Sequence, residues 1–142
     1  MKFFIPALAG IFLFAGTPAM ANPADVYGLW LTESKTGHVD IKDCGDGTPC
    51  GTLVWIDAPD PDAELDEFNP DPSLRSRTMV GIKLVWGFKP SAKGWKKGNI
   101  YDPQDGKTYR SHIMLTDSGD LQVKGCVGPL CKAQIWTKVE AD

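Results

Sequence analysis

Apolar and polar residues alternate along several short stretches of the chain, and the longest alternation runs from residue 79 to residue 88. It would place five large apolar side chains on one face: Val80, Ile82, Leu84, Trp86 and Phe88. A period of two residues is typical of a strand that is buried on one side. The pattern therefore predicts a half-buried strand over residues 79–88.

The same period recurs in shorter stretches, at Val39 and Ile41 and again at Leu121 and Val123. Further apolar stretches bring the total to about eight strands: 27–32, 51–56, 99–101, 107–116 and 133–139. Asp-Gly and Asp-Pro sequences between these stretches favour chain reversal. Many short strands joined by tight turns predict an all-β fold, and we prefer a single antiparallel up-and-down barrel to a sandwich.

Residues 57–76 interrupt this pattern with four prolines and seven acidic residues. The segment is expected to be a long loop. Loops of this length in compact domains are usually either functional or mobile. Two interpretations remain open here, a lid or partner contact and a disordered acidic insertion.

The first 21 residues have the organisation of a signal peptide, with Lys2, an apolar stretch over 3–15 and the sequence Ala19-Met20-Ala21. We expect this leader to be helical in the precursor and to be cleaved before Asn22. The apolar stretch is too short for a permanent membrane anchor, so no membrane span remains after cleavage. The domains would then be the leader, 1–21, and one barrel domain, 22–142, located in the periplasm.

The charge balance disfavours one class of partner. Without Lys2, the chain has 14 Lys and Arg residues against 18 Asp and Glu residues. A net negative charge is a poor match to nucleic acid, so we expect no nucleic-acid partner.

Four cysteines form two close pairs in the sequence, Cys44 with Cys50 and Cys126 with Cys131. Two local disulfides are the predicted arrangement, although four cysteines formally allow three pairings. A zinc site is disfavoured because five and four residues separate the paired cysteines and because an exported protein meets an oxidising compartment. We expect no metal and no cofactor.

Four segments together resemble the DUF2147 family of exported bacterial proteins: Gly-Leu-Trp-Leu-Thr at 28–32, the run 69–81, Tyr-Asp-Pro-x-x-Gly-Lys-Thr-Tyr at 101–109, and Gln-Ile-Trp-Thr-Lys-Val at 134–139. Many members also use both cysteine pairs. The resemblance implies a lipocalin-like, or calycin-like, barrel for nearly all of the chain after the leader. It does not imply an established activity, since a fold does not determine function.

The early Gly28-x-Trp30 sequence is similar to the glycine and tryptophan of lipocalins, whose indole closes one barrel end beneath a basic side chain of the last strand. The resemblance assigns that basic position to Lys138. The family pattern leads us to expect arginine there, and lysine lacks the planar guanidinium that stacks on an indole. The implied role of Trp30 and Lys138 is structural.

Arg75 and Arg77 stand where the acidic loop meets the predicted strand over 79–88. Two roles remain open. The arginines pair with Asp71 or Asp102 and tie the loop to the hairpin, or one of them points inward and holds the carboxylate or phosphate of a ligand. In the second case, aromatic side chains would line an apolar chamber or its mouth: Trp55, Trp86, Phe88, Tyr101 and Tyr109.

Asp102 and Asp105 allow a paired-carboxylate interpretation, as in glycosidases. The sequence Asp-Pro-x-Asp-Gly is also a turn sequence, in which the aspartates accept hydrogen bonds from backbone amides and Gly106 adopts a positive φ. We favour this structural role. His38 and His112, the two histidines of the chain, are expected to face solvent.

Three functional hypotheses follow. The first is a monomeric, non-enzymatic periplasmic barrel that binds a small apolar or amphipathic ligand. The second is an interaction protein of the cell envelope that contacts a protein partner through the loop 57–76, with a filled barrel and therefore no cavity. The third, with the least support, is a hydrolase or isomerase that uses Asp102, Asp105 or a tyrosine.

Overall fold

The computed structural model of the chain describes residues 10–13, 16 and 22–140. The predicted leader and its cleavage point therefore lie largely outside the described residues. Within the described ranges, no helix is long and apolar enough to cross a membrane.

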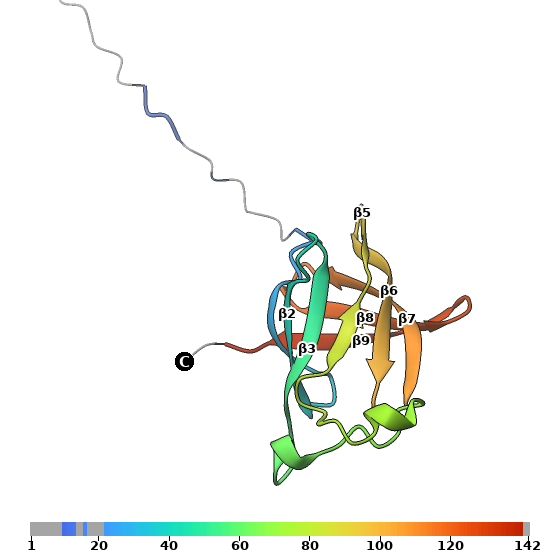
Figure 1. The fold of residues 1–142 in the computed structure, drawn as a ribbon. Helices are drawn as coiled ribbons and strands as arrows, with labels where there is room; N and C mark the ends of the chain where they lie inside the picture. Colours follow the sequence, from blue (N-terminus) through green and yellow to red (C-terminus); the bar gives the residue numbers. More distant parts are fainter. Residues whose placement is uncertain (1–9, 14–15, 17–21, 141–142) are drawn as a thin grey trace, which may run out of the picture.

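The described residues contain nine strands, which form one antiparallel sheet. Strand β4 pairs with both β3 and β6, so eight of these strands close into a barrel (Figure 1). The strands are β1 Gly28–Leu31, β2 Gly37–Asp43, β3 Pro49–Ile56, β4 Lys83–Trp86, β5 Lys89–Ser91, β6 Gly94–Asp102, β7 Lys107–Leu115, β8 Leu121–Val127 and β9 Leu130–Lys138. The barrel order is β4-β3-β2-β1-β9-β8-β7-β6. Strand β5 pairs with the first residues of β6, outside the closed ring. The predicted all-β antiparallel barrel of about eight strands is confirmed.

The predicted strand over 79–88 is wrong in its extent. Strand β4 covers Lys83–Trp86, and the separate strand β5 was not predicted. Gly81 and Gly87 adopt positive φ angles of 105° and 77°, which interrupt the extended backbone on both sides of β4. Leu84 and Val85 are both buried, so β4 is covered on both faces and the expected alternation fails there.

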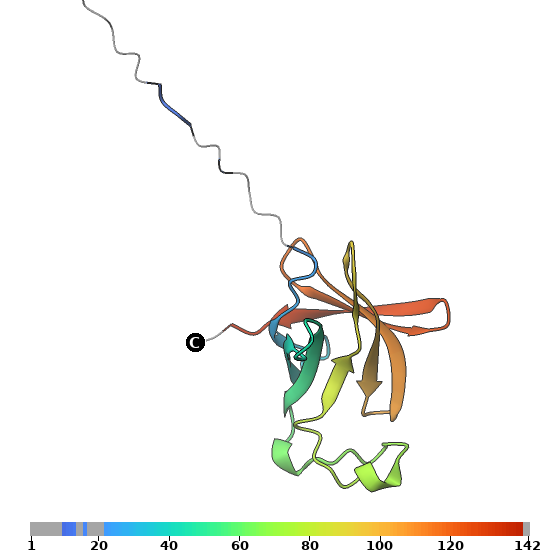
Figure 2. The same ribbon diagram turned by 45° about the horizontal axis from the view of Figure 1, so that its top comes forward.

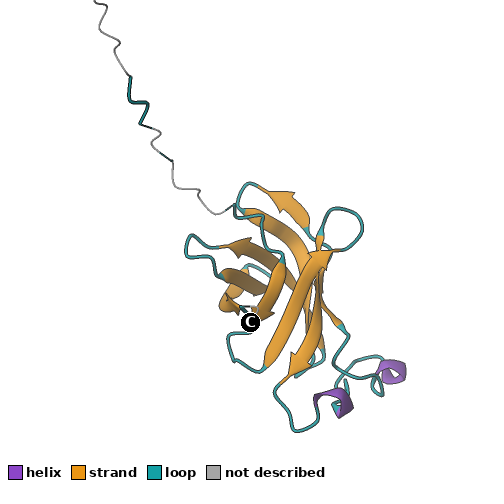
Figure 3. Ribbon diagram, turned by 90° about the vertical axis from the view of Figure 1, so that its left-hand side faces the viewer, coloured by secondary structure: helices purple, strands orange, loops and turns teal. Residues whose placement is uncertain are grey.

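The connection between β3 and β4, residues 57–82, is folded back on itself. Its backbone pairs Asp66 N with Arg77 O at 3.0 Å and Met79 N with Glu64 O at 2.8 Å. Two short 3₁₀ helices, η1 (Pro61–Ala63) and η2 (Pro72–Leu74), each have proline in the first turn, where the missing N–H costs nothing. The connection lies across one end of the barrel (Figures 1 and 3).

The other end of the barrel is closed by the segment before β1 and by a tryptophan. The Trp30 side chain is fully buried, and its Nε1 donates to the Val26 carbonyl at 2.9 Å. Trp95 Nε1 donates to the Ala24 carbonyl at 2.9 Å and ties the same segment to β6. Lys138 Nζ lies 5.1 Å from the centroid of the Trp30 ring, so a cation covers the indole.

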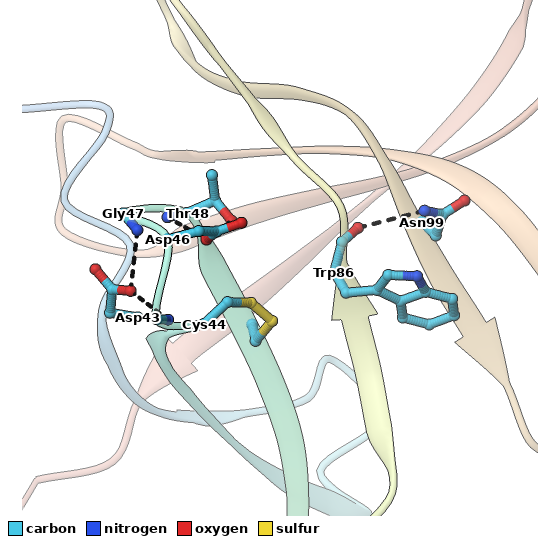
Figure 4. The surroundings of a disulfide bond; sticks show 9 residues. Asp43, Cys44, Asp46, Gly47, Thr48, Trp86 and Asn99 are labelled. Carbon is cyan, nitrogen blue, oxygen red and sulfur yellow. Dashed lines mark hydrogen bonds between the residues drawn. A yellow bond between two sulfur atoms is a disulfide. The ribbon is translucent and has the colours of Figure 1, made fainter.

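Both predicted disulfides, Cys44–Cys50 and Cys126–Cys131, are present. The first spans the β2–β3 turn, where Asp43 Oδ1 accepts hydrogen bonds from the amides of Gly45 and Gly47 at 2.6 and 3.1 Å (Figure 4). The second joins the ends of β8 and β9. Two disulfides are compatible with an exported protein.

Candidate functional site

A chamber of about 1220 Å³ opens at the end of the barrel opposite the Trp30 closure. Apolar side chains from several strands line it: Leu53, Leu84, Ile100, Val123 and Trp136. Its rim is built by the β1–β2 turn, the start of the β3–β4 connection, the β6–β7 turn and the β8–β9 hairpin. The chamber is thus an open hollow whose apolar floor belongs to the packed core and whose sides are turns and loops.

The rim of this chamber is more acidic than basic. Among its lining residues, the carboxylates are Glu33, Asp57, Glu64 and Asp102, and the cation is Lys132. The Glu33 carboxylate accepts a hydrogen bond from a β9 backbone amide at 2.6 Å. A neutral or cationic polar group on a ligand therefore meets a more favourable rim than an anionic group does.

Arg77 pairs with a carboxylate that the sequence had not singled out, Asp66. Its Nε and Nη2 atoms lie 3.0 and 2.9 Å from Asp66 Oδ2. The expected partners, Asp71 and Asp102, form no ion pair with either arginine within the described residues. The physical reason is burial, since Asp66 is fully buried and needs a cation more than an exposed aspartate does.

Arg75 braces the same connection in a different way. Its Nε donates to the Asn69 carbonyl oxygen at 2.7 Å, six residues earlier in the chain. The pKa of the nearby Asp71 carboxyl is lowered, first by hydrogen bonds from Ser73 and then by the charge of Arg75. Neither Arg75 nor Arg77 is among the residues that line the chamber.

The Asp66 carboxylate joins the connection to the barrel wall. Besides Arg77, it accepts the Tyr101 hydroxyl at 2.6 Å on Oδ1 and the Asn69 amide at 2.8 Å on Oδ2. Burial, together with the hydrogen bond to Asp66, raises the pKa of Tyr101 to about 12. A buried carboxylate with three side-chain donors is well satisfied, so we call Asp66, Asn69, Arg77 and Tyr101 the buried brace.

A close backbone contact lies beside the buried brace. Gly106, in the β6–β7 turn, has a φ of 69°, and a Cβ atom at this position would collide with the Phe68 carbonyl oxygen. The residues just before the run 69–81 and the motif 101–109 therefore meet in space. The loop and the hairpin are joined as one of the sequence interpretations expected, but through Asp66, Tyr101 and Gly106.

The carboxylates of the β6–β7 turn are engaged with the turn itself. Asp102 Oδ1 accepts the Gln104 amide at 2.9 Å, and Asp105 Oδ1 accepts the Lys107 amide at 2.8 Å. The Tyr109 hydroxyl donates to Asp105, and this hydrogen bond is the main cause of the lowered pKa of that carboxyl. These contacts are those of a turn rather than of a proton-transfer pair.

Three of the aromatic candidates lie away from the chamber. Trp55 packs against His38, with ring centroids 4.6 Å apart. Phe88 is buried against Gly98, where any Cβ atom would meet its ring. Trp86 is half-buried, and its carbonyl accepts from Asn99 at 3.5 Å (Figure 4). The expectation that these three residues line the chamber does not match their positions, whereas the side chains of Tyr101 and Tyr109 do line it.

His112 lies close to the second disulfide, and one of its ring nitrogens and the sulfur atoms of Cys126 and Cys131 are within 4.8 Å of one another. Both cysteines are in the disulfide, so they offer no thiolate for a metal ion. This cluster is not a metal site in the oxidised protein.

Comparison with known proteins agrees with this architecture. A family model described as "Uncharacterized protein conserved in bacteria (DUF2147)" matches residues 28–138. Among proteins with curated functions, none matches this chain. A similar solved structure is the protein HP1028 from the human pathogen Helicobacter pylori, described as belonging to the lipocalin family. It is 23% identical to this chain, the match covers 86% of this chain and 85% of that chain, and the TM-score is 0.71. At this identity the likeness shows a lipocalin-like fold and nothing about a ligand, whereas the family model spans most of the sequence: the chain belongs to the DUF2147 family.

Proposed function

We propose that this protein binds a small, mostly apolar molecule in the barrel chamber. The observation that carries the proposal is the chamber itself, because its volume of about 1220 Å³ leaves room for a small molecule, whose pockets usually measure roughly 300–1,000 Å³. A barrel that serves only as a scaffold is expected to be filled by its own side chains. The filled-barrel interaction protein therefore has less support.

The chemistry of the chamber suggests what kind of molecule fits. The walls offer aliphatic and aromatic surface, so removal of apolar ligand surface from water would supply most of the affinity. The arginines that were candidates for an anionic head group are occupied by Asp66 and by the Asn69 carbonyl. We therefore favour a ligand whose polar end is neutral or cationic and faces the acidic rim.

A catalytic role has less support in the geometry. Asp102 and Asp105 are both held by turn amides, and Asp105 also accepts the Tyr109 hydroxyl. A general acid or base needs to reach a proton on a substrate, whereas these carboxylates stabilise the turn.

Gly125 offers a direct test of the chamber. It lines the chamber, and a Cβ atom there would meet only Ile100 Cγ2 at 3.7 Å, an ordinary contact. The variant Gly125→Phe projects a ring into the chamber, and we expect ligand affinity to fall about tenfold, the effect of a typical overpacking cost. The matched control is Ala133→Phe on the neighbouring strand β9, because Ala133 is exposed and does not line the chamber.

The ligand is first sought by comparing the masses of the exported protein under native and denaturing conditions. A reproducible, extractable adduct that Gly125→Phe loses and Ala133→Phe keeps would support the proposal. A panel of fatty acids, fatty amines and neutral lipophiles provides the second readout, as stabilisation against heat. Absence of both an adduct and any stabilisation contradicts the proposal and favours the interaction protein.

A further inference from the structure

Charge is distributed very unevenly along this acidic chain. Residues 22–72 contain two Lys and Arg residues against 12 Asp and Glu residues, whereas residues 73–139 contain 12 against four. The acidic part includes β1 to β3 and most of the β3–β4 connection, and the basic part includes β4 to β9. The folded protein therefore has surfaces of opposite sign, although its net charge is small.

The positive charge gathers on the outer face of β6, β7 and β8. Arg110 and His112 alternate along β7 with the buried Ser111 and Ile113, so they point away from the barrel interior. We define the cationic face by its basic side chains: Lys93, Lys96, Lys97, Arg110 and Lys124 around His112. None of the five Lys and Arg side chains forms an ion pair with a described carboxylate.

The centre of the cationic face is His112. Burial lowers the pKa of its imidazole, and the charges of Lys124, Arg110 and Lys96 lower it further, which places all three cations near one ring. A groove of about 190 Å³ beside it is lined by Lys93, Lys96, His112 and Lys124. Closely spaced, unpaired cations beside a groove of this size suit a phosphate group.

An apolar projection lies beyond the cationic face, at the end of β8 and the start of β9. The tip of the β8–β9 hairpin, residues 127–130, includes Val127 and Leu130, which are 67% and 77% exposed. The Cys126–Cys131 disulfide closes the hairpin immediately behind the tip. The hairpin projects away from the barrel (Figure 2). We call residues 127–130 the apolar tip.

We propose that the cationic face and the apolar tip together bind an anionic lipid surface. Basic side chains near such a surface are attracted to its head groups, and exposed apolar side chains gain by entering the boundary with the acyl chains. A nucleic acid or an acidic protein would use the cations but would leave Val127 and Leu130 exposed to water. An anionic lipid surface can contact both the cations and the apolar side chains of the tip.

This binding would also orient the chamber. Val127 and Leu130 line one side of the chamber as well as forming the tip, so a docked hairpin would turn the β8–β9 side of the rim, which includes Lys132, toward the lipid. The acidic residues of the β3–β4 connection would be repelled from the same anionic surface, which favours one orientation over others. Lipid binding stands apart from the proposed ligand function, because it uses the outer surface and does not require an occupied chamber.

The test measures co-sedimentation of the exported protein with vesicles of phosphatidylcholine alone or with equal parts of phosphatidylglycerol. We expect binding to the anionic vesicles only, weakened by salt. The variant Lys96→Glu/Arg110→Glu changes two exposed cations of the cationic face and should reduce binding by about 25-fold or more, since each basic residue contributes about fivefold. The control Lys42→Glu/Lys83→Glu makes the same change in net charge on the β2–β4 side of the barrel and should bind as the parent does.

Thermal unfolding first establishes that each variant is folded. If Lys96→Glu/Arg110→Glu does not fold, Lys93→Glu is used in its place. Leu130→Ser should weaken binding to the anionic vesicles several-fold, because roughly the transfer energy of one leucine side chain is lost. Unchanged binding would show that the apolar tip is not part of the lipid-binding surface. No binding to anionic vesicles, equal binding to both vesicle types, or equal loss in the control overturns the proposal. Binding to polyphosphate without binding to vesicles also overturns it, in favour of a soluble polyanion.

Discussion

The Tyr101 hydroxyl donates a 2.6 Å hydrogen bond to Oδ1 of Asp66, and this contact joins the barrel wall to the β3–β4 connection across 35 positions of sequence. Asp66 is fully buried and Tyr101 is only 6% exposed, so water cannot replace the contact when either partner is removed. The same carboxylate is held by Arg77. The connection, which begins at the chamber rim, is thereby fixed to the barrel rather than left to move freely over the mouth.

Tyr101→Phe should destabilise the protein by about 1.5–3 kcal/mol, the usual range for a hydrogen bond to a charged group. The ring and its packing are kept, so the loss comes from the hydroxyl alone. Unfolding in urea, followed by fluorescence, measures the change. The matched control is Tyr109→Phe. The Tyr109 hydroxyl donates to the exposed Asp105, so its removal should change the free energy of unfolding by no more than about 0.5 kcal/mol. Equal effects of the two substitutions would contradict the buried brace.

The two arginines should differ in the same assay. Arg77→Met removes the cation of a fully buried carboxylate and should cost about 3 kcal/mol or more. Arg75→Met removes one part-buried hydrogen bond to a backbone carbonyl of the connection and should cost about 1 kcal/mol.

Ligand affinity distinguishes this role from the head-group role. Neither arginine lines the chamber, so both variants should bind a chamber ligand as the parent does at temperatures where they are folded. A selective loss of affinity for anionic ligands in either variant would restore the head-group interpretation.

The barrel was predictable because its evidence is local. Alternation at 38–42 and 121–124 and the Asp-Gly turns each report on a few neighbouring residues, and each was found as a strand or a turn. The region 79–91 was predicted poorly because two glycines with positive φ break the extended chain, and apolar alternation does not reveal backbone angles.

The buried brace was not predictable, because it depends on a contact that is distant in sequence. Asp66 is one of seven acidic residues in the run 57–76, and composition does not distinguish it from its exposed neighbours. Its partners Tyr101 and Arg77 were both noticed, but only the fold shows that they share one carboxylate. The two segments that meet are therefore recognisable from the sequence, whereas the residue that joins them is not.

Gly106→Ala should destabilise the protein more than the same change at Gly119. Both glycines have positive φ angles, 69° and 86°, and share the backbone cost of about 1 kcal/mol for a residue with a Cβ atom. At Gly106 the new atom would also collide with the Phe68 carbonyl, whereas at Gly119 nothing lies within 4 Å. Urea unfolding should show an additional loss of about 1–3 kcal/mol for Gly106→Ala. Equal losses would mean that the connection moves away without cost, and that it is not held against the hairpin.

Alkaline pH should remove part of the stability that Tyr101 provides. Its pKa is raised from 10.0 to about 12 in the folded protein, so between these values the unfolded chain loses the phenolic proton while the folded protein keeps it. Folding is then coupled to proton uptake, and the contribution, complete below pH 10, is lost as the pH rises toward 12. The slope from one such group is at most about 1.4 kcal/mol per pH unit. Urea unfolding of the parent and of Tyr101→Phe, from neutral pH to about pH 11, measures this contribution. The difference between their free energies of unfolding should become smaller as the pH rises. A constant difference over this range would show that the phenol of Tyr101 titrates as a free tyrosine does and that Asp66 and burial do not retain its proton.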